Sequence, residues 1–324
     1  MPGTVFITGA NAGVGLATAR LFLAQGFSVA ATARNPSSSP ELQELLSQYP
    51  SALLVLPMDL LSPESIDSAV SSALSRFGRI DVLVNNAGYG QYGPLELISA
   101  PAVQNQFAAN VFGPIQLIKL FLAQTPPAAS SKDDGAERPR QPTIINVSSG
   151  GPYFGFPLAS LYTASKAALD MLTESLMYEL SALSSPVSAK LVVPHGIIIG
   201  TTFGRNLEAM GPLFAQDNEA AANVGAQARA DYEALVGRQM QMFQALASNP
   251  AAISAMTPAS RVAERIFEAA TDGKSDKLRY FVGPDAHGGA AAAMDLRFAG
   301  PSFEGEGFDE IDERYVSGVR KIFG

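Results

Sequence analysis

The chain has 324 residues, of which 47% are hydrophobic and 16% charged, which allows one large α/β domain or two small ones. A formal net charge of −8 argues against a broad basic surface for nucleic acid, and the lack of cysteine excludes disulfides, thiolate nucleophiles and cysteine-bound metals. With only two histidines, His195 and His287, no histidine-rich metal site is expected either.

The sequence also indicates the cellular compartment of the protein. We see no uninterrupted apolar run of ~18 residues, so no membrane span is expected. The strand-like stretch TVFIT begins at residue 4, which leaves no room for a signal peptide. The absence of cysteine fits a reducing compartment, and we expect a cytoplasmic protein.

Strand-like and helix-like segments alternate along the chain. Runs typical of buried strands cover 4–8, 27–33, 52–59, 81–88, 143–149, 189–194 and 277–283. Helical periodicity covers 15–26, 41–49, 62–78, 101–124, 160–183 and 257–274. The third of these helices has an N-cap in Ser62, a proline at its first position and a stop at Gly78. This alternation predicts an α/β fold, a parallel sheet with helices on both faces.

Three stretches depart from the alternation. Residues 126–142 are polar and rich in proline, and predict an exposed loop. An insertion of about 203–257 follows the sixth strand, and the tail of about 288–324 is rich in Gly and Ala and then acidic. The insertion predicts one amphipathic helix with its apolar face on Tyr232, Leu235, Val236, Gln239, Met240, Phe243 and Leu246. We see no separating linker and predict a single domain over 1–324.

The connection between the first strand and the first helix reads TGANAGVG, with glycines at 9, 13 and 15. Glycine permits a tight turn and lets backbone N–H groups approach a pyrophosphate, and the helix N-terminus adds partial positive charge. At this position in a parallel sheet the pattern predicts a dinucleotide-binding turn. The alternative is a tight turn that binds nothing.

The stretch LYTASKAAL places Tyr162 and Lys166 four residues apart, on the same face of a helix. A neighbouring positive charge favours phenolate and lowers a tyrosine pKa from its reference of ~10. A tyrosine tuned in this way can transfer a proton near neutral pH. Alone, the pair is more often two ordinary residues on a helix surface, so the rest of the chain has to decide.

Together these motifs resemble the classical short-chain dehydrogenase/reductase family, over about residues 4–203 and more weakly near Arg261 and Tyr280. NNAG at 85–88 ends the fourth strand, NVFG begins at Asn110, and Ser149 in NVSS lies thirteen residues before Tyr162. The resemblance implies a Rossmann-type doubly wound sheet and interconversion of a carbonyl and an alcohol. ATARNP, YGPLE and NVFG look most like steroid- and retinol-type reductases and fungal reductases of natural products.

The resemblance also implies catalytic roles. Tyr162 is the general acid or base, and Lys166 lowers its pKa and holds the nicotinamide ribose. Ser149 donates a hydrogen bond to the substrate oxygen, and Asn110 holds a water that links Lys166 to solvent. Strand alternation points the neighbouring Ser148 the other way. Ser149 as an ordinary strand-end serine, and Asn110 as a helix–helix contact, remain the alternatives.

The cofactor preference is read at the end of the second strand. Ala33 stands where an NAD enzyme of this family carries Asp, and Arg34 can pair with the 2′-phosphate of NADP. We therefore predict NADP(H), with stacking of Arg34 on adenine as the alternative. One departure is Ala12, where some NADP-dependent relatives carry a second basic residue.

Other cofactor contacts follow from the resemblance. Asp59 meets the adenine edge, unless it only caps a helix, and Asn85, Ala87 and Gly88 flank the adenosine ribose. PHGIIIGTT departs from the usual Pro-Gly-x-x-x-Thr pattern, so Thr201 and Thr202 both remain possible for the nicotinamide amide. The predicted cofactor-binding set is Thr8, Gly9, Asn11, Gly13, Val14, Gly15, Arg34, Asn35, Asp59, Leu60, Asn85, Ala87, Gly88, Tyr162, Lys166, Pro194 and Thr201.

Apolar and aromatic residues gather in the segments expected beyond the strand ends, and they favour a bulky, largely apolar small-molecule substrate. Ordinary core packing is the alternative for each. The predicted substrate-binding residues are Tyr153, Phe154, Phe156, Ile198 and Phe203. Helices 104–124 and 163–183 predict a homo-oligomer, because they often form the dimer interface in the family.

Two other kinds of function use the same scaffold. One is a non-redox enzyme such as a dehydratase, isomerase or cyclase, and the other is a non-enzymatic NADP-binding protein. Members of the second kind commonly lose the tyrosine or the lysine, and this chain keeps both. The four retained polar residues therefore favour an NADP(H)-dependent oxidoreductase.

Overall fold

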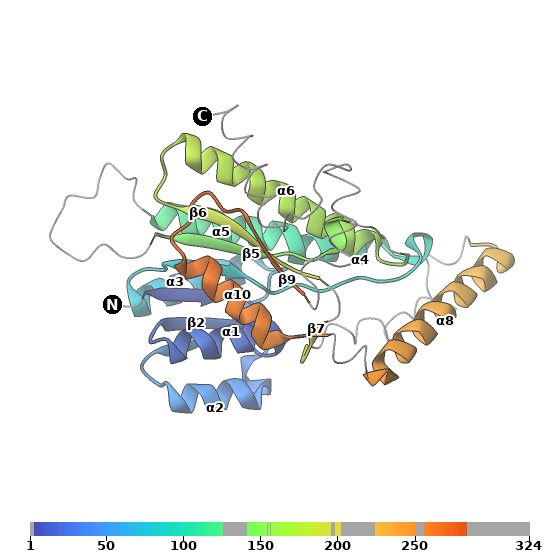
Figure 1. The fold of residues 1–324 in the computed structure, drawn as a ribbon, viewed down its shortest axis with the longest axis horizontal. Helices are drawn as coiled ribbons and strands as arrows, with labels where there is room; N and C mark the ends of the chain where they lie inside the picture. The colour runs from blue at the N-terminus through green and yellow to red at the C-terminus, as the bar shows by residue number, and fades with distance from the viewer. Residues whose placement is uncertain are drawn as a thin grey trace.

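The computed structural model describes residues 3–125, 141–153, 155, 157–195, 198–201, 224–250 and 256–283. The predictions for the tail and for most of the 126–142 loop lie outside these residues. So do those for Phe154, Phe156 and Phe203 as substrate-binding residues. The described part of the chain is drawn in colour in Figure 1.

The main sheet of the described residues has seven strands, and every strand pair in it is parallel. The spatial order is β3-β2-β1-β4-β5-β6-β9. The bounds are β1 Thr4–Ile7, β2 Ser28–Ala33, β3 Leu53–Pro57, β4 Val82–Asn85, β5 Thr143–Val147, β6 Ser188–Pro194 and β9 Arg279–Val282. All seven predicted strands are confirmed. A second pairing, β7 Ile198–Ile199 with β8 Thr257–Pro258, is too short to leave a periodic pattern in the sequence.

The strand order reverses at β1, whose neighbours are β2 on one side and β4 on the other. This is the topology of a Rossmann-type doubly wound sheet, as predicted. In such sheets the ligand lies beyond the carboxyl ends of the strands at the point of reversal. The segments that follow β1, β2, β4 and β5 therefore define where a site is expected.

Helices cover both faces of the sheet (Figure 1). One layer holds α1 Gly13–Ala24, α2 Pro40–Gln48 and α10 Ala259–Thr271; the other holds α3 Pro63–Phe77, α5 Gly113–Gln124 and α6 Ser160–Ala182. The alternation of strand side chains creates the two cores. In β1, Val5 and Ile7 pack towards the first layer and Phe6 towards the second. The predicted caps of α3 are confirmed, with Ser65 N–H donating to Ser62 and Gly78 in the left-handed conformation.

The predicted helix over 101–124 is interrupted, which corrects the expectation of one continuous helix. The chain forms α4 Ala100–Phe107, a π turn Ala108–Phe112 and then α5. Among the described residues, the run Ala100–Gln124 alone is long and apolar enough to pass a length-and-composition test for a membrane span. Half of its apolar window is buried inside the protein, where it packs between α3 and α6.

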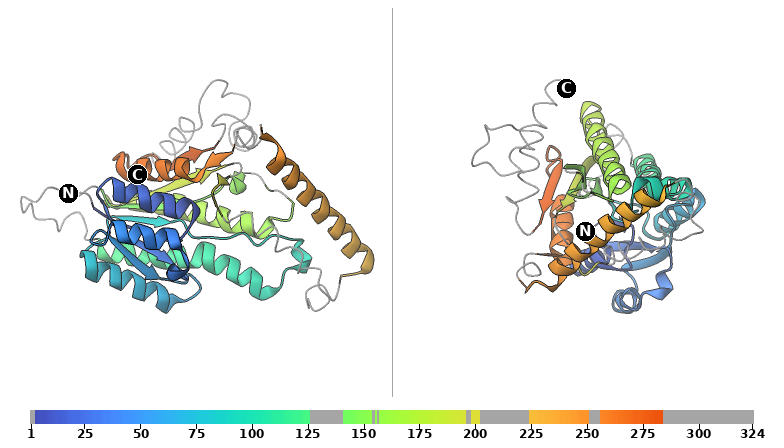
Figure 2. Two further views of the ribbon diagram at one scale, coloured as in Figure 1. Left: turned by 90° about the horizontal axis from the view of Figure 1, so that it is seen from below. Right: turned by 90° about the vertical axis from the view of Figure 1, so that its right-hand side faces the viewer.

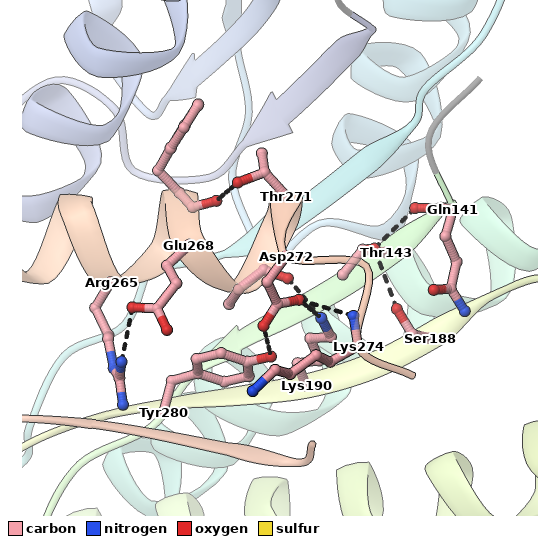
Figure 3. Close-up of polar contacts among 12 residues, drawn as sticks. Gln141, Thr143, Ser188, Lys190, Arg265, Glu268, Thr271, Asp272, Lys274 and Tyr280 are labelled. Carbon is pink, nitrogen blue, oxygen red and sulfur yellow. Dashed lines mark hydrogen bonds and ion pairs between the residues drawn. The ribbon is translucent and has the colours of Figure 1, made fainter. Parts of the chain in front are cut away.

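A buried lysine fixes the β9 edge of the sheet (Figure 3). Lys190 of β6 is 1% exposed, and its Nζ donates to the Ala269 carbonyl oxygen at 2.8 Å and to Asp272 Oδ1 at 2.7 Å. The Tyr280 hydroxyl of β9 donates to Asp272 Oδ2 at 2.5 Å. These contacts join β6, the end of α10 and β9.

Helix α8, Ala226–Ser248, stands apart from both layers at one end of the molecule (Figures 1 and 2). Its part-buried face carries five of the residues predicted for the apolar face of the insertion helix: Tyr232, Leu235, Val236, Gln239 and Met240. The side chains of Phe243 and Leu246 lie outside the described ones. The helix is therefore confirmed, whereas the limits of the insertion stay a prediction.

Candidate active site

The glycine turn after β1 is a tight bend in which three residues, Gly9, Gly13 and Gly15, lack a side chain. Gly9 and Gly13 have positive φ angles of 66° and 54°, where glycine is favoured. A Cβ on Gly15 would lie 2.2 Å from the Gly9 carbonyl oxygen. Helix α1 begins here, and no side chain caps it. The backbone can therefore approach an anion such as a pyrophosphate at the helix N-terminus, so the residues present fit a dinucleotide.

Thr8 joins this turn to the end of β4. It is buried, and its Oγ1 accepts from the N–H groups of Asn86 at 3.0 Å and Ala87 at 2.8 Å. Thr8 thus holds the backbone at the end of β4, and its cofactor-binding role stays a prediction. Thr201 lies against the other side of the turn, because a Cβ on Gly13 would lie 3.2 Å from its Cγ2. Thr202 lies outside the described residues.

The residues predicted for the adenosine end lie after β2 and β3. Arg34 and Asn35 are exposed. Burial raises the pKa of Tyr89 in the loop after β4, and the Arg34 charge lowers it in part, so this charge lies near that loop. Asp59 Oδ1 accepts from Leu61 N–H at 3.0 Å and shapes the turn after β3. The helix cap is Ser62, not Asp59.

Other predicted cofactor residues occupy nearby backbone positions. The Asn11 carbonyl oxygen accepts from the Ser39 hydroxyl at 2.8 Å, and the Pro194 carbonyl oxygen from Gly150 N–H at 2.8 Å. Val14 packs partly buried beside the α1-side core. Leu60 lies against the start of α5, since a Cβ on Gly113 would lie 3.0 Å from its Cδ2.

Two side chains lie elsewhere than predicted. Asn85 is 2% exposed and donates to Asn146 Oδ1 at 2.8 Å, so its side chain ties β4 to β5 instead of flanking a ribose. Tyr153 is 6% exposed, and its hydroxyl bonds Asp170 and Arg279 in the interior. Burial of these two side chains within the sheet and core is the physical reason. Ile198 is part-buried beside the α1-side core, and its substrate-binding role stays a prediction.

The four predicted catalytic residues do come together. Tyr162 and Lys166 follow one another on the buried face of α6, each 6% exposed. Ser149, two residues after β5, hydrogen-bonds the Tyr162 hydroxyl. Lys166 Nζ donates to the Val147 carbonyl oxygen at 2.7 Å. Asn110 lies in the π turn, near Lys166: a Cβ on Gly88 would lie 3.1 Å from Asn110 Oδ1 and 3.6 Å from Lys166 Nζ.

Burial dominates the electrostatics of this group. Burial raises the pKa of Tyr162 to about 12, the hydrogen bond from Ser149 opposes the rise, and the Asp170 charge adds to it. Burial lowers the pKa of Lys166 to about 8, and the Asp170 charge opposes that change. Desolvation therefore raises the Tyr162 pKa in the protein alone, whereas the sequence predicted that Lys166 would lower it.

Sequence reasoning missed the polar residues that hold the loop after β4. Gln106 is fully buried; its Nε2 donates to the Tyr89 carbonyl oxygen at 2.9 Å, and its Oε1 accepts from Gln91 N–H at 2.6 Å. Asn110 also holds Tyr89, because its Nδ2 donates to the Tyr89 carbonyl oxygen at 2.9 Å. The same Nδ2 donates to Ser165 Oγ at 3.1 Å. Gln106 and Asn110 are four residues apart, and this spacing could have predicted that both side chains contact the same loop.

An apolar cluster adjoins Tyr162 on the α8 side. The Tyr92 ring centroid lies 6.0 Å from that of Tyr162. Tyr92 packs with Leu158, Ala159 and three α8 residues: Leu235, Val236 and Met240. Among the described residues, no group of three or more His, Asp or Glu side chains could hold a metal ion. An apolar surface beside a phenol and a hydroxyl suits a carbonyl or alcohol group on an apolar molecule.

Curated relatives share this chain's sequence over most of its sheet. An uncharacterized oxidoreductase of Schizosaccharomyces pombe is 34% identical over 244 residues, which cover 75% of this chain and 87% of the relative. Human retinol dehydrogenase 8 is 36% identical over 205 residues, which cover 61% of this chain and 60% of that protein.

Solved structures share the fold. A short-chain dehydrogenase from Streptomyces avermitilis is 26% identical with a TM-score of 0.65, covering 99% of this chain and 97% of that one. A short-chain dehydrogenase/reductase from Burkholderia phymatum in complex with NAD is 21% identical, with a TM-score of 0.64 and coverage of 86% and 88%. A blue fluorescent protein from a metagenomic library in complex with NADPH is 22% identical, with a TM-score of 0.60 and coverage of 87% and 96%.

The sequence model described as short chain dehydrogenase matches residues 3–210. That span contains the glycine turn, Asn110, Ser149, Tyr162 and Lys166, the residues that the fold brings to the carboxyl ends of the strands. The chain therefore belongs to the short-chain dehydrogenase family of oxidoreductases.

Proposed function

We propose that the protein is an NADP(H)-dependent oxidoreductase that interconverts a carbonyl and an alcohol on a bulky, largely apolar small molecule. One observation carries the proposal: the Tyr162 hydroxyl, hydrogen-bonded to Ser149, lies buried one helical turn from Lys166. This arrangement supplies a proton donor, an oxygen-binding hydroxyl and a positive charge at one point.

The chemistry of the reduction assigns a task to each group. The nicotinamide cofactor supplies the hydride that forms the new C–H bond. Ser149 and Tyr162 hydrogen-bond the carbonyl oxygen, and Tyr162 transfers its proton to that oxygen as negative charge develops on it. The Lys166 ammonium stabilises the resulting phenolate, which regains its proton from solvent. Oxidation of the alcohol runs the same steps in reverse.

The NADP(H) preference rests on the end of β2. Ala33 places no carboxylate beside a 2′-phosphate, and Arg34 supplies an exposed guanidinium there. The similar structures include complexes with both NAD and NADPH, so they do not decide between the two cofactors for this chain. The preference has to be measured on the protein itself. Steady-state rates with equal concentrations of NADPH and NADH test it directly.

The substrate class rests on the apolar cluster of Tyr92, Leu158, Ala159, Leu235, Val236 and Met240 beside Tyr162. The name of one relative, retinol dehydrogenase 8, refers to a substrate that is itself bulky and apolar. We therefore propose a ketone, aldehyde or alcohol carried on a hydrocarbon-rich skeleton. A cytoplasmic location stays a prediction, for which fractionation of the source cells is the test.

The test is NADPH oxidation, followed by absorbance, against a panel of bulky ketones, aldehydes and quinones. Wild type is expected to turn over at least one of them. Tyr162→Phe is expected to lose at least about 10²-fold in rate, because it cannot donate the proton, while it still binds NADPH. Tyr49→Phe is the matched control, since Tyr49 lies at the C-cap of α2, just before β3 and away from the carboxyl ends of the strands. NADPH binding without reduction of any carbonyl would favour a non-redox enzyme instead.

A further inference from the structure

Behind the catalytic pair, α6 carries a line of buried polar side chains. They recur every four residues: Tyr162, Lys166, Asp170 and Glu174 are buried, and Tyr178, the next in the series, is half-buried. Residues four apart on a helix are neighbours, so Asp170 lies one turn beyond Lys166. Asp170 is 4% exposed and Glu174 is 4% exposed. Tyr162 and Lys166 therefore lie at one end of a longer row of polar and charged side chains along α6.

Asp170 accepts hydrogen bonds from two segments that follow β5. One carboxylate oxygen accepts from the Ser148 hydroxyl, and the other accepts from the Tyr153 hydroxyl at 3.2 Å. The Tyr153 hydroxyl in turn accepts from Arg279 Nε at 3.0 Å. The charged groups that act on Asp170 are Arg279 from β9 and Lys166 from α6.

Arg279 closes the network from the last strand. It is 7% exposed, and its Nη2 donates to Glu174 Oε2 at 2.5 Å. Glu174 Oε1 also accepts from the Tyr178 hydroxyl at 3.1 Å. Two carboxylates, Asp170 and Glu174, thus balance two cations, Lys166 and Arg279. Buried charges are stable only when they are paired and hydrogen-bonded, so loss of one member changes the charge of the others.

The network also fixes the end of β5. The Val147 carbonyl oxygen accepts from Lys166, the Ser148 hydroxyl bonds Asp170, and the Ser149 hydroxyl bonds Tyr162. Three consecutive residues are thus tied to three turns of α6. Because Ser148 and Ser149 are adjacent, the anchor at Asp170 restricts where the Ser149 hydroxyl can lie.

We infer that Asp170 is a positioning residue, which keeps Lys166 positively charged and Ser149 in place, and that Arg279 keeps Asp170 ionised. This inference rests on the proposed function for its effect on catalysis, whereas its effect on Lys166 does not. Burial raises the pKa of Asp170 to about 6, and Ser148, Arg279, Tyr153 and Lys166 oppose the rise. At neutral pH Asp170 is then mostly a carboxylate beside an ammonium.

The first experiment measures the Lys166 pKa without substrate or cofactor. The chain has seven lysines, so the side-chain ¹³Cε signals can be followed by NMR as pH is raised, with Lys166→Met to assign the signal. Asp170→Asn is expected to lower the Lys166 pKa by about one pH unit or more, because it removes a neighbouring negative charge. Glu179→Gln, an exposed carboxylate on the same helix, is the control and is expected to leave it unchanged.

The second experiment measures kcat/KM for carbonyl reduction against pH. Reduction needs protonated Tyr162 and cationic Lys166, and the Asp170 charge raises the pKa of both. Asp170→Asn therefore moves the alkaline fall of activity to lower pH and lowers kcat, while NADPH binding changes little. Arg279→Lys, which keeps the charge, is expected to resemble wild type.

Ser148→Ala gives the same information if Asp170→Asn fails to fold, because it removes one hydrogen bond and no charge. Ser148→Ala is expected to lower the Lys166 pKa and to move the alkaline fall of activity to lower pH. Both changes are expected to be smaller than in Asp170→Asn. A wild-type Lys166 pKa and pH profile in both variants, whatever their melting temperatures, would overturn the inference. A shifted Lys166 pKa in a protein that reduces no carbonyl would support the inference and contradict the proposed function.

Discussion

Arg34 is the residue on which the cofactor preference depends. Its guanidinium is exposed at the end of β2, beside Ala33 and near the loop that carries Tyr89. A charge-assisted contact to a phosphate contributes about 1.5–3 kcal/mol, which is roughly 10- to 100-fold in affinity. Arg34→Ala is therefore expected to raise the KM for NADPH by about that factor and to leave the KM for NADH nearly unchanged.

Steady-state kinetics with both cofactors measure the effect of Arg34→Ala. Arg20→Ala, which removes an exposed arginine from α1, is the matched control and is expected to change neither KM. An unchanged KM for NADPH in Arg34→Ala would contradict the role of this residue. Equal loss with NADPH and NADH would favour the alternative in which Arg34 stacks on adenine.

Single residues also show what spacing can and cannot predict. The i, i+4 spacing placed Tyr162 beside Lys166 correctly, and the same spacing could have found Asp170. Arg279 could not be found in this way, because it lies 105 residues from Glu174 and meets it only through the pairing of β9 with β6. Tyr153 was predicted at the substrate because it is aromatic, yet its hydroxyl needs a buried partner and bonds Asp170.

At the scale of elements, the junction of β6, α10 and β9 depends on one buried ion pair. Lys190 and Asp272 are joined at 2.7 Å, with side-chain exposures of 2% and 14%. Removing one partner of such a pair leaves a buried charge uncompensated, which costs about 3–5 kcal/mol. Asp272→Asn is expected to lower the free energy of unfolding by about that amount, as measured by urea denaturation.

The exposed carboxylate of Glu264 provides the control for this stability prediction. Glu264→Gln removes an exposed partner of Arg261 on α10, and such pairs contribute at most about 1 kcal/mol. Lys190→Met with Asp272→Leu, which removes both charges, is expected to recover much of the loss. Equal destabilisation by Asp272→Asn and Glu264→Gln would show that the buried pair does not hold this edge.

Elements with long periodic patterns were predictable, and the exceptions have physical reasons. The strands other than the edge strand β3 are largely buried on both faces, so their apolar runs are clear, and α3 carries its own cap signals. The π turn at Ala108–Phe112 was not predictable, because its extra residue is stabilised by tertiary contacts of Asn110 with Tyr89 and Ser165. The strands β7 and β8 have two residues each and carry no periodicity.

At the scale of the whole molecule, one apolar face suggests self-association. Phe112 is 61% exposed and lines a groove on α5 with Ile115, Gln116, Lys119 and Leu120. Met171 on α6 is 56% exposed. Exposed apolar patches of this kind often mark interfaces, and we propose that two copies meet on the α5 and α6 face.

Equilibrium sedimentation tests this association. Wild type is expected to form a dimer, and Phe112→Glu is expected to weaken dimerisation by at least about 100-fold, because it buries an unpaired charge. Leu95→Glu, at a position that is 58% exposed and lies before α4, is the control. Wild type that sediments only as a monomer at every concentration would exclude the dimer.

The central claim is that buried Tyr162 and Lys166 move a proton while a hydride reaches a carbonyl carbon. The most direct measurement uses NADPH deuterated at the transferred position with any carbonyl that wild type reduces, and mass spectrometry of the alcohol. The account predicts one deuterium on the former carbonyl carbon with wild type, and less than about 1% of that rate with Tyr162→Phe. A product formed without deuterium, or equal rates for both proteins, would contradict it.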